Sequence, residues 1–573
     1  MKRFFTFLLL SIFVLGNQLY SQEPLPKGLT EEEKKDYIEF INNPPAPKNA
    51  MQPTAPPRTP GEWEEAEGVI VSWAAFSPEL REIVREAREV AKVYIICDDC
   101  STVQNYLTNG GVSMTNIEML QPPFNSVWVR DYGPQSVYLD NGDLAIIDWL
   151  YNRPHRPDDN NIPNYMANHL GAPFYQLSGS SGMLVATGGN FMSDGHGSGF
   201  SSKLILTENP SYTEAQIDQI KYDYMGIDRY IKMDELPYDI ISHLDMHMKL
   251  LDEETLLVAQ FPSGVSDGPY IEANLQYVLN NYNTAFDRDY QVVRIPMVPS
   301  SSGQYPPNSH YRTFTNSLIL NELVLVPQYG HHLDETGLQI YRDAMPGYNV
   351  VGVNMENVIA YAGAIHCITR EIAATDPIHI SHARRRIALV EEDEIDFKAV
   401  VNSPSGIESV YLMWTDDIEN GFEAVEMTFE NGEYYAHLEG EELEEGMMIH
   451  YYLEATNNNS KTIAKPLVAP EGYYSFEVKL IDDTSIDENK IHPTFALYPN
   501  PATSIITFSA SPKFAGGSLS ITNMQGKTVF ETEIDRNDYD ILMSIDVNNL
   551  PGGIYVVKAI KDNLIEVKKF VKQ

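Results

Sequence analysis

The chain has 573 residues, of which 43% are hydrophobic, and 80 acidic against 40 basic residues give a formal net charge of −40. This charge argues against nucleic acid and anionic membranes as partners, and solubility explains it more simply than attraction of a cationic substrate. The length predicts several domains.

The N-terminus has the pattern of an export signal. Two basic residues precede an uncharged apolar run over residues 4–15, and Ser21 marks the expected cleavage point, so residues 1–21 predict a secretory signal peptide. We therefore expect a protein exported through the periplasm and then secreted or attached to the outer surface. Residues 22–60 are rich in proline and predict an extended linker or pro-segment with one helix over residues 30–41.

Residues 61–382 alternate between strand and helix patterns, which predicts an α/β domain. An Asn-Gly pair at Asn141 predicts a hairpin between two of the strands. Strands are expected over residues 69–73, 93–96, 135–139, 144–149, 204–206, 255–261, 291–295, 317–320 and 323–327, and helices over residues 78–90, 212–225, 271–286 and 337–344.

Two of the three cysteines, Cys97 and Cys100, are close enough in sequence to suggest a pair. A zinc site would need a second such pair. The two aspartates between them disfavour a redox motif, because carboxylates raise the pKa of a thiol. We interpret the pair as structural, with a short-loop disulfide as one form.

Helical periodicity ends near Arg384. Short strands are expected over residues 395–401, 410–414, 425–429, 434–438 and 450–455, which predicts a β-sandwich over residues 383–481. A linker over residues 482–490 leads to an all-β unit over residues 491–573. Its Tyr498-Pro499-Asn500-Pro501, its Gly552-Gly553-Ile554-Tyr555 and its lysine-rich end resemble the C-terminal sorting domain of type IX secretion substrates, which would make that machinery a partner.

An apolar run over residues 358–362 comes just before the stretch Gly363–Arg370 that contains Cys367. That position suits a nucleophile at the mouth of a core, although a lone cysteine is more often structural. Asp131 lies beside a Gly-Pro turn, and His243 and Asp245 are two residues apart, so that on a strand both would point to one face. Each has an ordinary structural interpretation when taken alone.

Together these residues supply a thiol, an imidazole and two carboxylates. A second carboxylate would oppose acyl transfer, in which the substrate develops negative charge. It suits a guanidinium, whose fork of N–H donors matches carboxylate oxygens while the thiolate attacks the central carbon.

Three motifs carry a family resemblance: Trp-x-Arg-Asp-x-Gly-Pro from Trp128, His-x-Asp from His243, and Gly-x-Ile-His-Cys-Ile-Thr from Gly363. They resemble the guanidino-group-modifying superfamily, above all the agmatine deiminases and the Porphyromonas-type peptidylarginine deiminase. The resemblance implies a pentein fold, a pseudo-five-fold α/β propeller, for residues 61–382, followed by an Ig-like sandwich and the sorting domain. It implies no metal and no organic cofactor.

The resemblance also assigns roles. It makes Cys367 the nucleophile, His243 the general acid/base, and Asp131 and Asp245 the guanidinium-binding carboxylates. Supporting, substrate-binding positions are implied at Trp128, Gly189, Asn190 and Asn316.

Substrate choice depends on the loop over residues 151–157. Arg153 matches the first of two arginines that would bind the C-terminal carboxylate of a peptide, but His155 stands at the second position. The alternative is that Arg153 pairs with Asp158 or Asp159. We expect a deiminase of peptidyl or free arginine; the alternatives are an exported agmatine deiminase that makes N-carbamoylputrescine and, more remotely, an inactive surface-binding protein.

Overall fold

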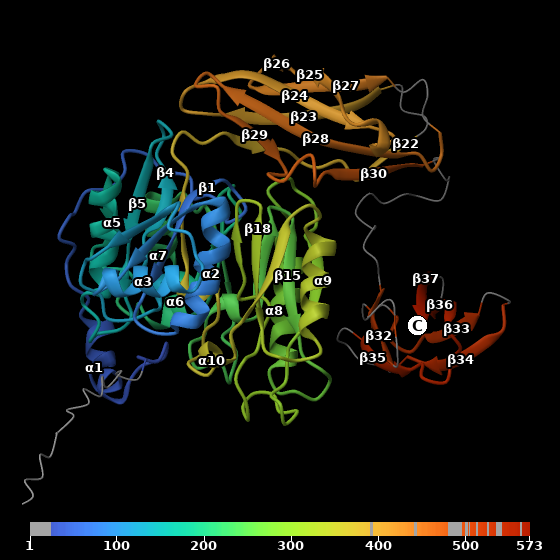
Figure 1. The fold of residues 1–573 in the computed structure, drawn as a ribbon, viewed down its shortest axis with the longest axis horizontal. Coiled ribbons are helices and arrows are strands. Elements are labelled where there is room, and N and C mark those ends of the chain that lie inside the picture. Colours follow the sequence, from blue (N-terminus) through green and yellow to red (C-terminus); the bar gives the residue numbers. More distant parts are fainter. Residues whose placement is uncertain are drawn as a thin grey trace, which may run out of the picture.

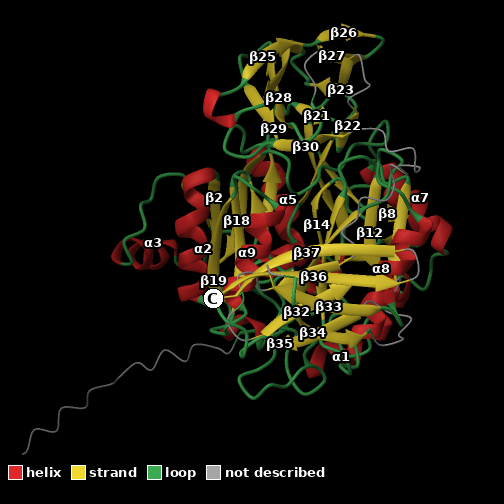
Figure 2. Cartoon of the chain, turned by 90° about the vertical axis from the view of Figure 1, so that its right-hand side faces the viewer, coloured by secondary structure: helices red, strands yellow, loops and turns green. Residues whose placement is uncertain are grey.

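The computed structural model describes residues 24–389, 394–439, 444–479, 495–498, 502, 505–510, 514–523, 526–534, 541–561 and 564–572. The expected signal peptide and the 482–490 linker lie outside these residues. The chain forms an α/β unit, a β-sandwich against one end of it, and a C-terminal unit of strands (Figures 1 and 2). Within the described residues, no helix has the length and apolar character needed to cross a bilayer.

Five sheets of three or four strands build the α/β unit within residues 66–373, all of which the structure describes. In each, one inner strand has an antiparallel neighbour on one side and a parallel neighbour on the other. The sheets are β20 (Arg370–Ala373)–β1 (Ala66–Ser72)–β2 (Lys92–Ile96)–β3 (Ile117–Leu120); β4 (Gln135–Tyr138)–β5 (Leu144–Asp148)–β7 (Phe174–Gln176); β11 (Met192–Ser193)–β12 (Ser198–Ser202)–β13 (Arg229–Met233); β14 (Met248–Asp252)–β15 (Thr255–Gln260)–β16 (Gln291–Pro296); and β17 (Leu318–Leu320)–β18 (Leu323–Gln328)–β19 (Asn349–Asn354).

Amphipathic helices cover these sheets. In α2 (Ser77–Val90) the apolar side chains Leu80, Ile83, Val84 and Ala87 recur at helical spacing and are all buried. The other helices are α1 (Glu31–Asn42), α3 (Cys100–Asn109), α4 (Val129–Tyr132), α5 (Ile162–Leu170), α6 (Leu204–Thr207), α7 (Glu214–Met225), α8 (Gly268–Asn281), α9 (Asp334–Ala344) and α10 (Glu356–Ile359).

The first and last strands of the α/β unit pair with each other. β20 runs antiparallel to β1, with Ile70 opposite Arg370 and Val69 opposite Glu371. Cys367 lies three residues before β20, in the 3-10 turn His366–Ile368. This pairing brings the cysteine against the start of the unit.

Two local predictions for the α/β unit are wrong. The expected strand over residues 204–206 is the helix α6, and the strand of that region is β12; a short apolar run does not distinguish a buried strand from a buried helix. His243 and Asp245 do not lie on one strand, because the 3-10 turn Leu244–Met246 follows His243 directly.

The β-sandwich has two sheets, which enclose a core that includes Phe397, Leu412, Leu453 and Phe476. The expected strand over residues 425–429 is two strands, since the chain changes sheet at Met427. The strands are β21 (His379–Ser381), β22 (Ile387–Leu389), β23 (Glu394–Asn402), β24 (Ile407–Thr415), β25 (Glu423–Glu426), β26 (Thr428–Glu430), β27 (Glu433–Glu439), β28 (Met448–Asn457), β29 (Thr462–Lys465) and β30 (Tyr474–Lys479).

The C-terminal unit has two sheets around its own core, which includes Phe508, Leu519 and Phe570. Their strand orders are β31 (Phe495–Tyr498)–β32 (Ile505–Ala510)–β35 (Ile541–Asp546) and β34 (Thr528–Glu533)–β33 (Ser518–Asn523)–β36 (Gly553–Lys561)–β37 (Leu564–Lys572).

All three cysteines lie among the described residues. Cys97 and Cys100 form a disulfide between the end of β2 and the start of α3, as the structural interpretation allowed. Cys367 is free and buried.

Candidate active site

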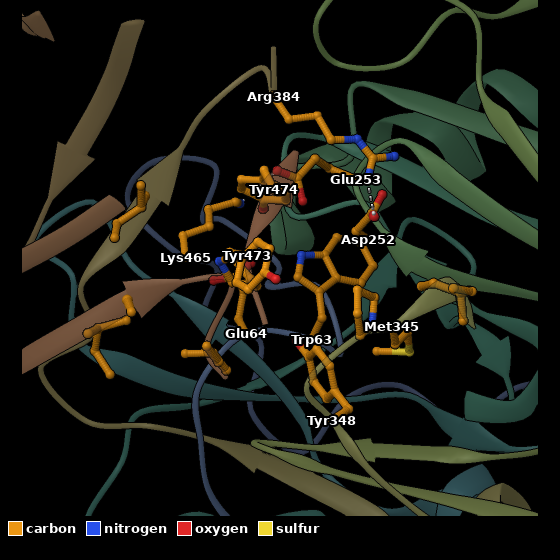
Figure 3. Close-up of a pocket in the computed structure, with 18 of the residues that line it drawn as sticks. Trp63, Glu64, Asp252, Glu253, Met345, Tyr348, Arg384, Lys465, Tyr473 and Tyr474 are labelled. Atoms are coloured by element: carbon orange, nitrogen blue, oxygen red, sulfur yellow. Dashed lines mark ion pairs between the residues drawn. The ribbon is translucent and has the colours of Figure 1, made fainter. Parts of the chain in front are cut away.

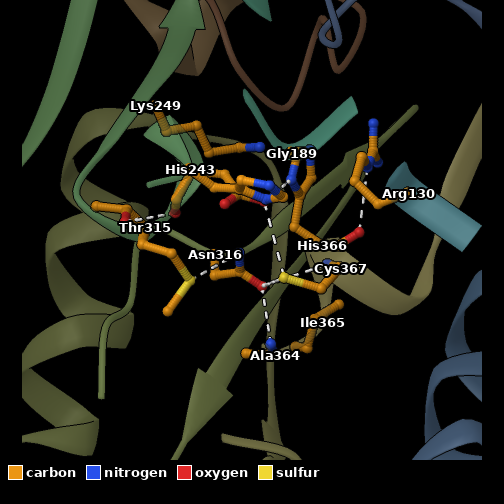
Figure 4. A network of polar contacts seen from close by, with 12 residues as sticks. Arg130, Gly189, His243, Lys249, Thr315, Asn316, Ala364, Ile365, His366 and Cys367 are labelled. Carbon is orange, nitrogen blue, oxygen red and sulfur yellow. Dashed lines mark hydrogen bonds and ion pairs between the residues drawn. The ribbon is translucent and has the colours of Figure 1, made fainter. Parts of the chain in front are cut away.

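Asn316 holds the turn that carries Cys367. Its side-chain oxygen accepts from the backbone N–H of Ala364 at 3.1 Å and of Cys367 at 3.3 Å, and Sγ of Cys367 lies 3.3 Å from the same oxygen. Figure 4 shows these contacts converging on one atom. Asn316 therefore fixes the position of the thiol rather than facing a ligand directly.

Asp131 lies in α4, within the first of the three motifs. Its carboxylate accepts from the backbone N–H of Gly189 at 3.2 Å and is fully buried. A Cβ atom at Gly189 would lie 2.5 Å from Nδ1 of His243, 3.0 Å from Asp131 Oδ1 and 3.1 Å from Asp245 Oδ2. Only glycine lets the backbone come so close to three functional side chains.

His243 is fully buried beside Asp131. Its Nε2 lies 3.0 Å from Oγ1 of Thr187, and its Nδ1 lies 3.5 Å from Oδ1 of Asp131. Burial and the nearby ammonium of Lys27 lower the pKa of His243 to about 4. The imidazole is therefore neutral at neutral pH and can accept a proton.

Asp245 belongs to a chain of polar and charged side chains that runs away from the thiol. Its Oδ2 lies 2.8 Å from Nδ1 of His366 and 3.8 Å from Sγ of Cys367, while Nε2 of His366 lies 2.9 Å from Glu62. Glu62 in turn pairs with Lys249 at 2.8 Å. Burial pushes the pKa of Asp245 upward, but the Lys27 ammonium and the His366 hydrogen bond outweigh it and hold that pKa well below its usual range.

The thiol of Cys367 is protonated at neutral pH. Burial raises its pKa to about 12, the carboxylate of Asp245 adds to the rise, and the ammonium of Lys27 opposes it. A cation placed between the thiol and the aspartates thus favours the thiolate.

Three buried polar atoms around the thiol have no hydrogen-bond partner within the described part of the chain. They are Oδ2 of Asp131, Oδ1 of Asp245 and Nδ1 of His243. Unsatisfied buried acceptors are costly and uncommon in folded proteins. Two free carboxylate oxygens beside a thiol and an imidazole are suited to a ligand that carries several N–H donors and a positive charge.

The cation that faces the thiol here is Lys27, from the N-terminal segment. Its ammonium donates to Sγ of Cys367 at 2.7 Å and lies 3.9 Å from Oδ1 of Asp131. The side chain is 0% exposed, and its surroundings hold its pKa above the usual range despite burial.

Arg153 does not pair with Asp158 or Asp159, so that alternative is wrong. Those aspartates bind residues 125–126 instead. The guanidinium of Arg153 donates from Nε and Nη2 to the main-chain carbonyl of Lys27, at 2.8 and 2.5 Å.

The other expected positions lie close to the same cluster. The indole N–H of Trp128 donates to the carbonyl of Leu25 at 2.8 Å. The side-chain oxygen of Asn190 accepts from the backbone of Ser202 at 2.8 Å, so this amide supports the loop. The structure thus brings Cys367, Asp131, Asp245, His243, Gly189, Asn316, Trp128 and Arg153 together around one point.

Sequence reasoning missed five contributors to this cluster. His366 is part of a motif already quoted, and its position directly beside the cysteine was a usable signal; Thr187 lies two residues before the expected position Gly189. The other three have no local pattern that marks them: Lys27, Glu62 and Lys249.

A cavity of about 450 Å³ lies elsewhere, at the junction of the α/β unit and the β-sandwich. Trp63, Asp252 and Tyr348 line it from one side, and Lys465 and Tyr474 from the other (Figure 3). Cys367 is not among the residues that line it.

Comparison with known proteins agrees with this cluster. Residues 58–372 match the family model of the Porphyromonas-type peptidyl-arginine deiminase. The chain belongs to this family. As a member of the Porphyromonas-type peptidyl-arginine deiminase family it is a deiminase, a hydrolase that acts on the C–N bonds of linear amidines. Residues 496–573 match a secretion-system C-terminal sorting domain, which indicates export to the cell surface or beyond.

Relatives of this family member include proteins named as agmatine deiminases. One from Vibrio parahaemolyticus is 23% identical over 357 residues, which is 55% of this chain and 96% of the relative. One from Legionella pneumophila is 25% identical over 267 residues, 45% of this chain and 75% of the relative. The solved agmatine deiminase of Enterococcus faecalis has a TM-score of 0.50 at 20% identity, covering 57% of this chain and 99% of its own, which shows a shared fold.

Proposed function

We propose that this chain is a secreted deiminase of peptidyl arginine, which it converts to peptidyl citrulline and ammonia through a covalent thiouronium on Cys367. The observation that carries the proposal is the set of free carboxylate oxygens, on Asp131 and Asp245, beside a buried thiol and a neutral imidazole. Two carboxylates can neutralise and orient a guanidinium through its fork of donors.

In the first half of the reaction, His243 takes the proton of the thiol and Sγ of Cys367 attacks the central carbon of the guanidinium. The new C–S bond gives a tetrahedral intermediate. The imidazolium then passes its proton to one amino group, which leaves as ammonia, and a cationic thiouronium remains. The substrate's own charge favours the thiolate, because a cation at this point lowers the pKa of Cys367.

In the second half, His243 removes a proton from a water molecule, which attacks the same carbon. The C–S bond breaks, the sulfur leaves with its electron pair and regains a proton, and the product carries a ureido group. Gly189 and Asn316 act as positioning residues, because the first allows the close approach of the loop and the second fixes the thiol.

The main-chain contacts around the site favour a peptide over a small amine. Arg153 and Trp128 donate to the carbonyls of Lys27 and Leu25, and the carbonyl of Tyr361 accepts from the backbone N–H of Lys27 at 3.2 Å. These groups bind features that a polypeptide has and agmatine lacks. Agmatine deimination is the second candidate, because the relatives and the solved neighbour are named for it; an inactive surface-binding protein is a remote third.

The architecture that goes with this function is also part of the proposal. The shared strand pattern of the five sheets supports a pentein propeller over residues 61–382, and the two sheets of residues 383–481 support an Ig-like module. The sorting domain supports export by the type IX machinery, with residues 1–21 as a removed signal peptide.

The test is a comparison of turnover for an internal-arginine peptide, a C-terminal-arginine peptide, free arginine and agmatine. Conversion is followed as released ammonia and as a mass gain of about one dalton per arginine. We expect the peptides to be preferred, and Cys367→Ala, Asp131→Asn and Asp245→Asn to lose turnover in folded protein. A higher kcat/KM for agmatine than for both peptides would replace the peptidyl assignment with the agmatine one, and wild-type rates in the variants would refute the site.

A further inference from the structure

The N-terminal segment, residues 24–42, places a fully buried lysine at the centre of the site. Transfer of an ammonium from water into a protein interior is strongly unfavourable unless opposite charges compensate it. Lys27 finds such compensation at one place, against Cys367 and Asp131, where the acidic groups hold its pKa above the usual range. A lysine in a simple linker would remain in water.

The main chain on both sides of Lys27 is held as well. Its N–H donates to the carbonyl of Tyr361 and its carbonyl accepts two hydrogen bonds from Arg153, while Trp128 binds the carbonyl of Leu25. Side chain and backbone are therefore bound together, as the arginine of a peptide substrate would have to be.

The helix α1 anchors this segment to the loop that carries Arg153. Glu33 forms a fully buried ion pair with Arg156, at 3.0 and 3.1 Å, and Arg156 also donates to the carbonyls of Pro26 and Gly28. Further along the helix, Tyr37 donates to Glu208. Figures 1 and 2 place α1 at the end of the α/β unit opposite the β-sandwich.

We propose that the N-terminal segment is an intramolecular pseudosubstrate that keeps the enzyme latent, with Lys27 in place of the arginine of a substrate. The identity of the group that it imitates rests on the proposed function. A lysine side chain ends in an ammonium nitrogen and presents no electrophilic carbon bonded to a leaving amine. It therefore fills the site and pairs with the thiol without being converted.

The connection that follows α1 is accessible for release. Asn42, Asn43, Pro45, Ala46 and Lys48 are exposed, as are Ala50, Met51 and Gln52. Cleavage there cuts the covalent link between the segment and the enzyme, so that binding of the segment becomes bimolecular. The concentration of the released segment, and with it the occupancy of the site, then falls with dilution. If the segment occupies the site in about nine molecules of ten, its removal raises the apparent affinity for substrate about tenfold.

The experiment uses the full chain in five forms. They are wild type, Lys27→Ala, Lys27→Arg, the exposed-lysine control Lys34→Ala, and a form with a specific protease site at residues 50–52, before and after cleavage and dilution. Each is assayed for kcat/KM on an arginine peptide and on agmatine, and for the rate of alkylation of Cys367 by iodoacetamide. The second readout needs no deiminase activity, and Cys367 is the free thiol of the chain.

We expect Lys27→Ala and the cleaved form to gain about tenfold or more in kcat/KM, with Lys34→Ala at wild-type values. Loss of the ammonium also raises the thiol pKa and lowers the thiolate fraction, so alkylation rates are compared per thiolate, with the thiolate fraction measured by its ultraviolet absorbance. On that scale both forms should gain about tenfold or more. In Lys27→Arg we expect the introduced arginine to become citrulline, with water supplying the oxygen and ammonia leaving, and no conversion when Cys367→Ala is added.

Two results overturn the inference. Equal alkylation and turnover in wild type, Lys27→Ala and the cleaved form would show that the segment does not close the site, and would leave the proposed function intact if those forms are active. If the arginine introduced by Lys27→Arg stays unconverted in an enzyme that converts free peptides, the segment does not bind as a substrate. Faster alkylation without turnover of any guanidine would uphold the closure and refute the proposed function instead.

Discussion

Replacement of Arg153 by alanine tests the proposal that this residue lets the enzyme distinguish a peptide from a free amine. Arg153 is 5% exposed, and its guanidinium donates from Nε at 2.8 Å and from Nη2 to one main-chain carbonyl. Hydrogen bonds from a charged group contribute about 1.5–3 kcal/mol, which corresponds to roughly 10- to 150-fold in kcat/KM. From the sequence alone, this loss is predicted only for substrates that end in arginine. In the structure Arg153 binds the carbonyl of Lys27, a residue within the chain. We therefore expect the same loss for substrates with an internal arginine.

The measurement has to be made after the N-terminal segment is released, because Arg153 also binds the carbonyl of Lys27. In the latent chain, its loss would weaken both substrate binding and inhibition, and the two effects would oppose each other. We therefore expect Lys27→Ala/Arg153→Ala to lose roughly 10- to 150-fold on both peptides relative to Lys27→Ala, and little on agmatine, which has no carbonyl to bind. Arg342→Ala, at an exposed arginine paired with Glu335, is the matched control.

Equal losses on agmatine and on the peptides would refute this reasoning. Such a result would mean that Arg153 shapes the pocket as a whole and does not recognise the main chain. A loss confined to peptides with a free C-terminal carboxylate would support the narrower prediction from sequence.

Two more predictions concern the geometry and the titration of the site. Gly189→Ala should reduce kcat about 100-fold or more, since its methyl group would displace His243 or a carboxylate by a good part of an ångström. The control Gly268→Ala, where the added carbon meets its nearest neighbour at 3.5 Å, should retain wild-type rates. A mild effect of Gly189→Ala would contradict the close packing described for Gly189. In Lys27→Ala, the alkylation rate of Cys367 should rise about tenfold per pH unit from pH 7 to 9, because burial and Asp245 place the thiol pKa near 12 and loss of the ammonium raises it further. Asp245→Asn removes a negative charge and lowers the thiol pKa, so it should shift the pH dependence of the alkylation rate to lower pH. If the alkylation rate of Lys27→Ala stopped rising below pH 9, the thiol pKa would not be raised as described.

The parts of the site that could be predicted from sequence are those whose chemistry is local. Cys367, Asp131 and the His243–Asp245 pair each lie in a short motif, and the combination of thiol, imidazole and carboxylates points to a guanidinium whatever the fold. The strand and helix pattern likewise predicts β1, α2 and β2 to within a few residues, because alternation and helical spacing reflect which face of an element is buried.

The parts that could not be predicted depend on contacts across the whole chain. Lys27 and Cys367 are 340 positions apart, and Glu62 and His366 are 304 apart. A proline-rich stretch with several lysines has the composition of a linker, and only the fold reveals that one of them, Lys27, lies in the site. The sequence also predicts a strand through His243 and Asp245, where the structure has a 3-10 turn. A strand and a 3-10 turn can each bring these two side chains to one site, so their spacing does not distinguish the two backbones.

The antiparallel pairing of β1 with β20 has a consequence for when the enzyme comes into existence. The turn that carries Cys367 directly precedes β20, and β20 has its place only beside β1, at the opposite end of the α/β unit. Contacts between segments so distant in sequence form slowly, because the chain between them must first be ordered. A chain still on the ribosome, or threaded unfolded through a translocon, therefore contains Cys367 but no assembled site. The producing cell meets no working deiminase until the last strand has closed the unit.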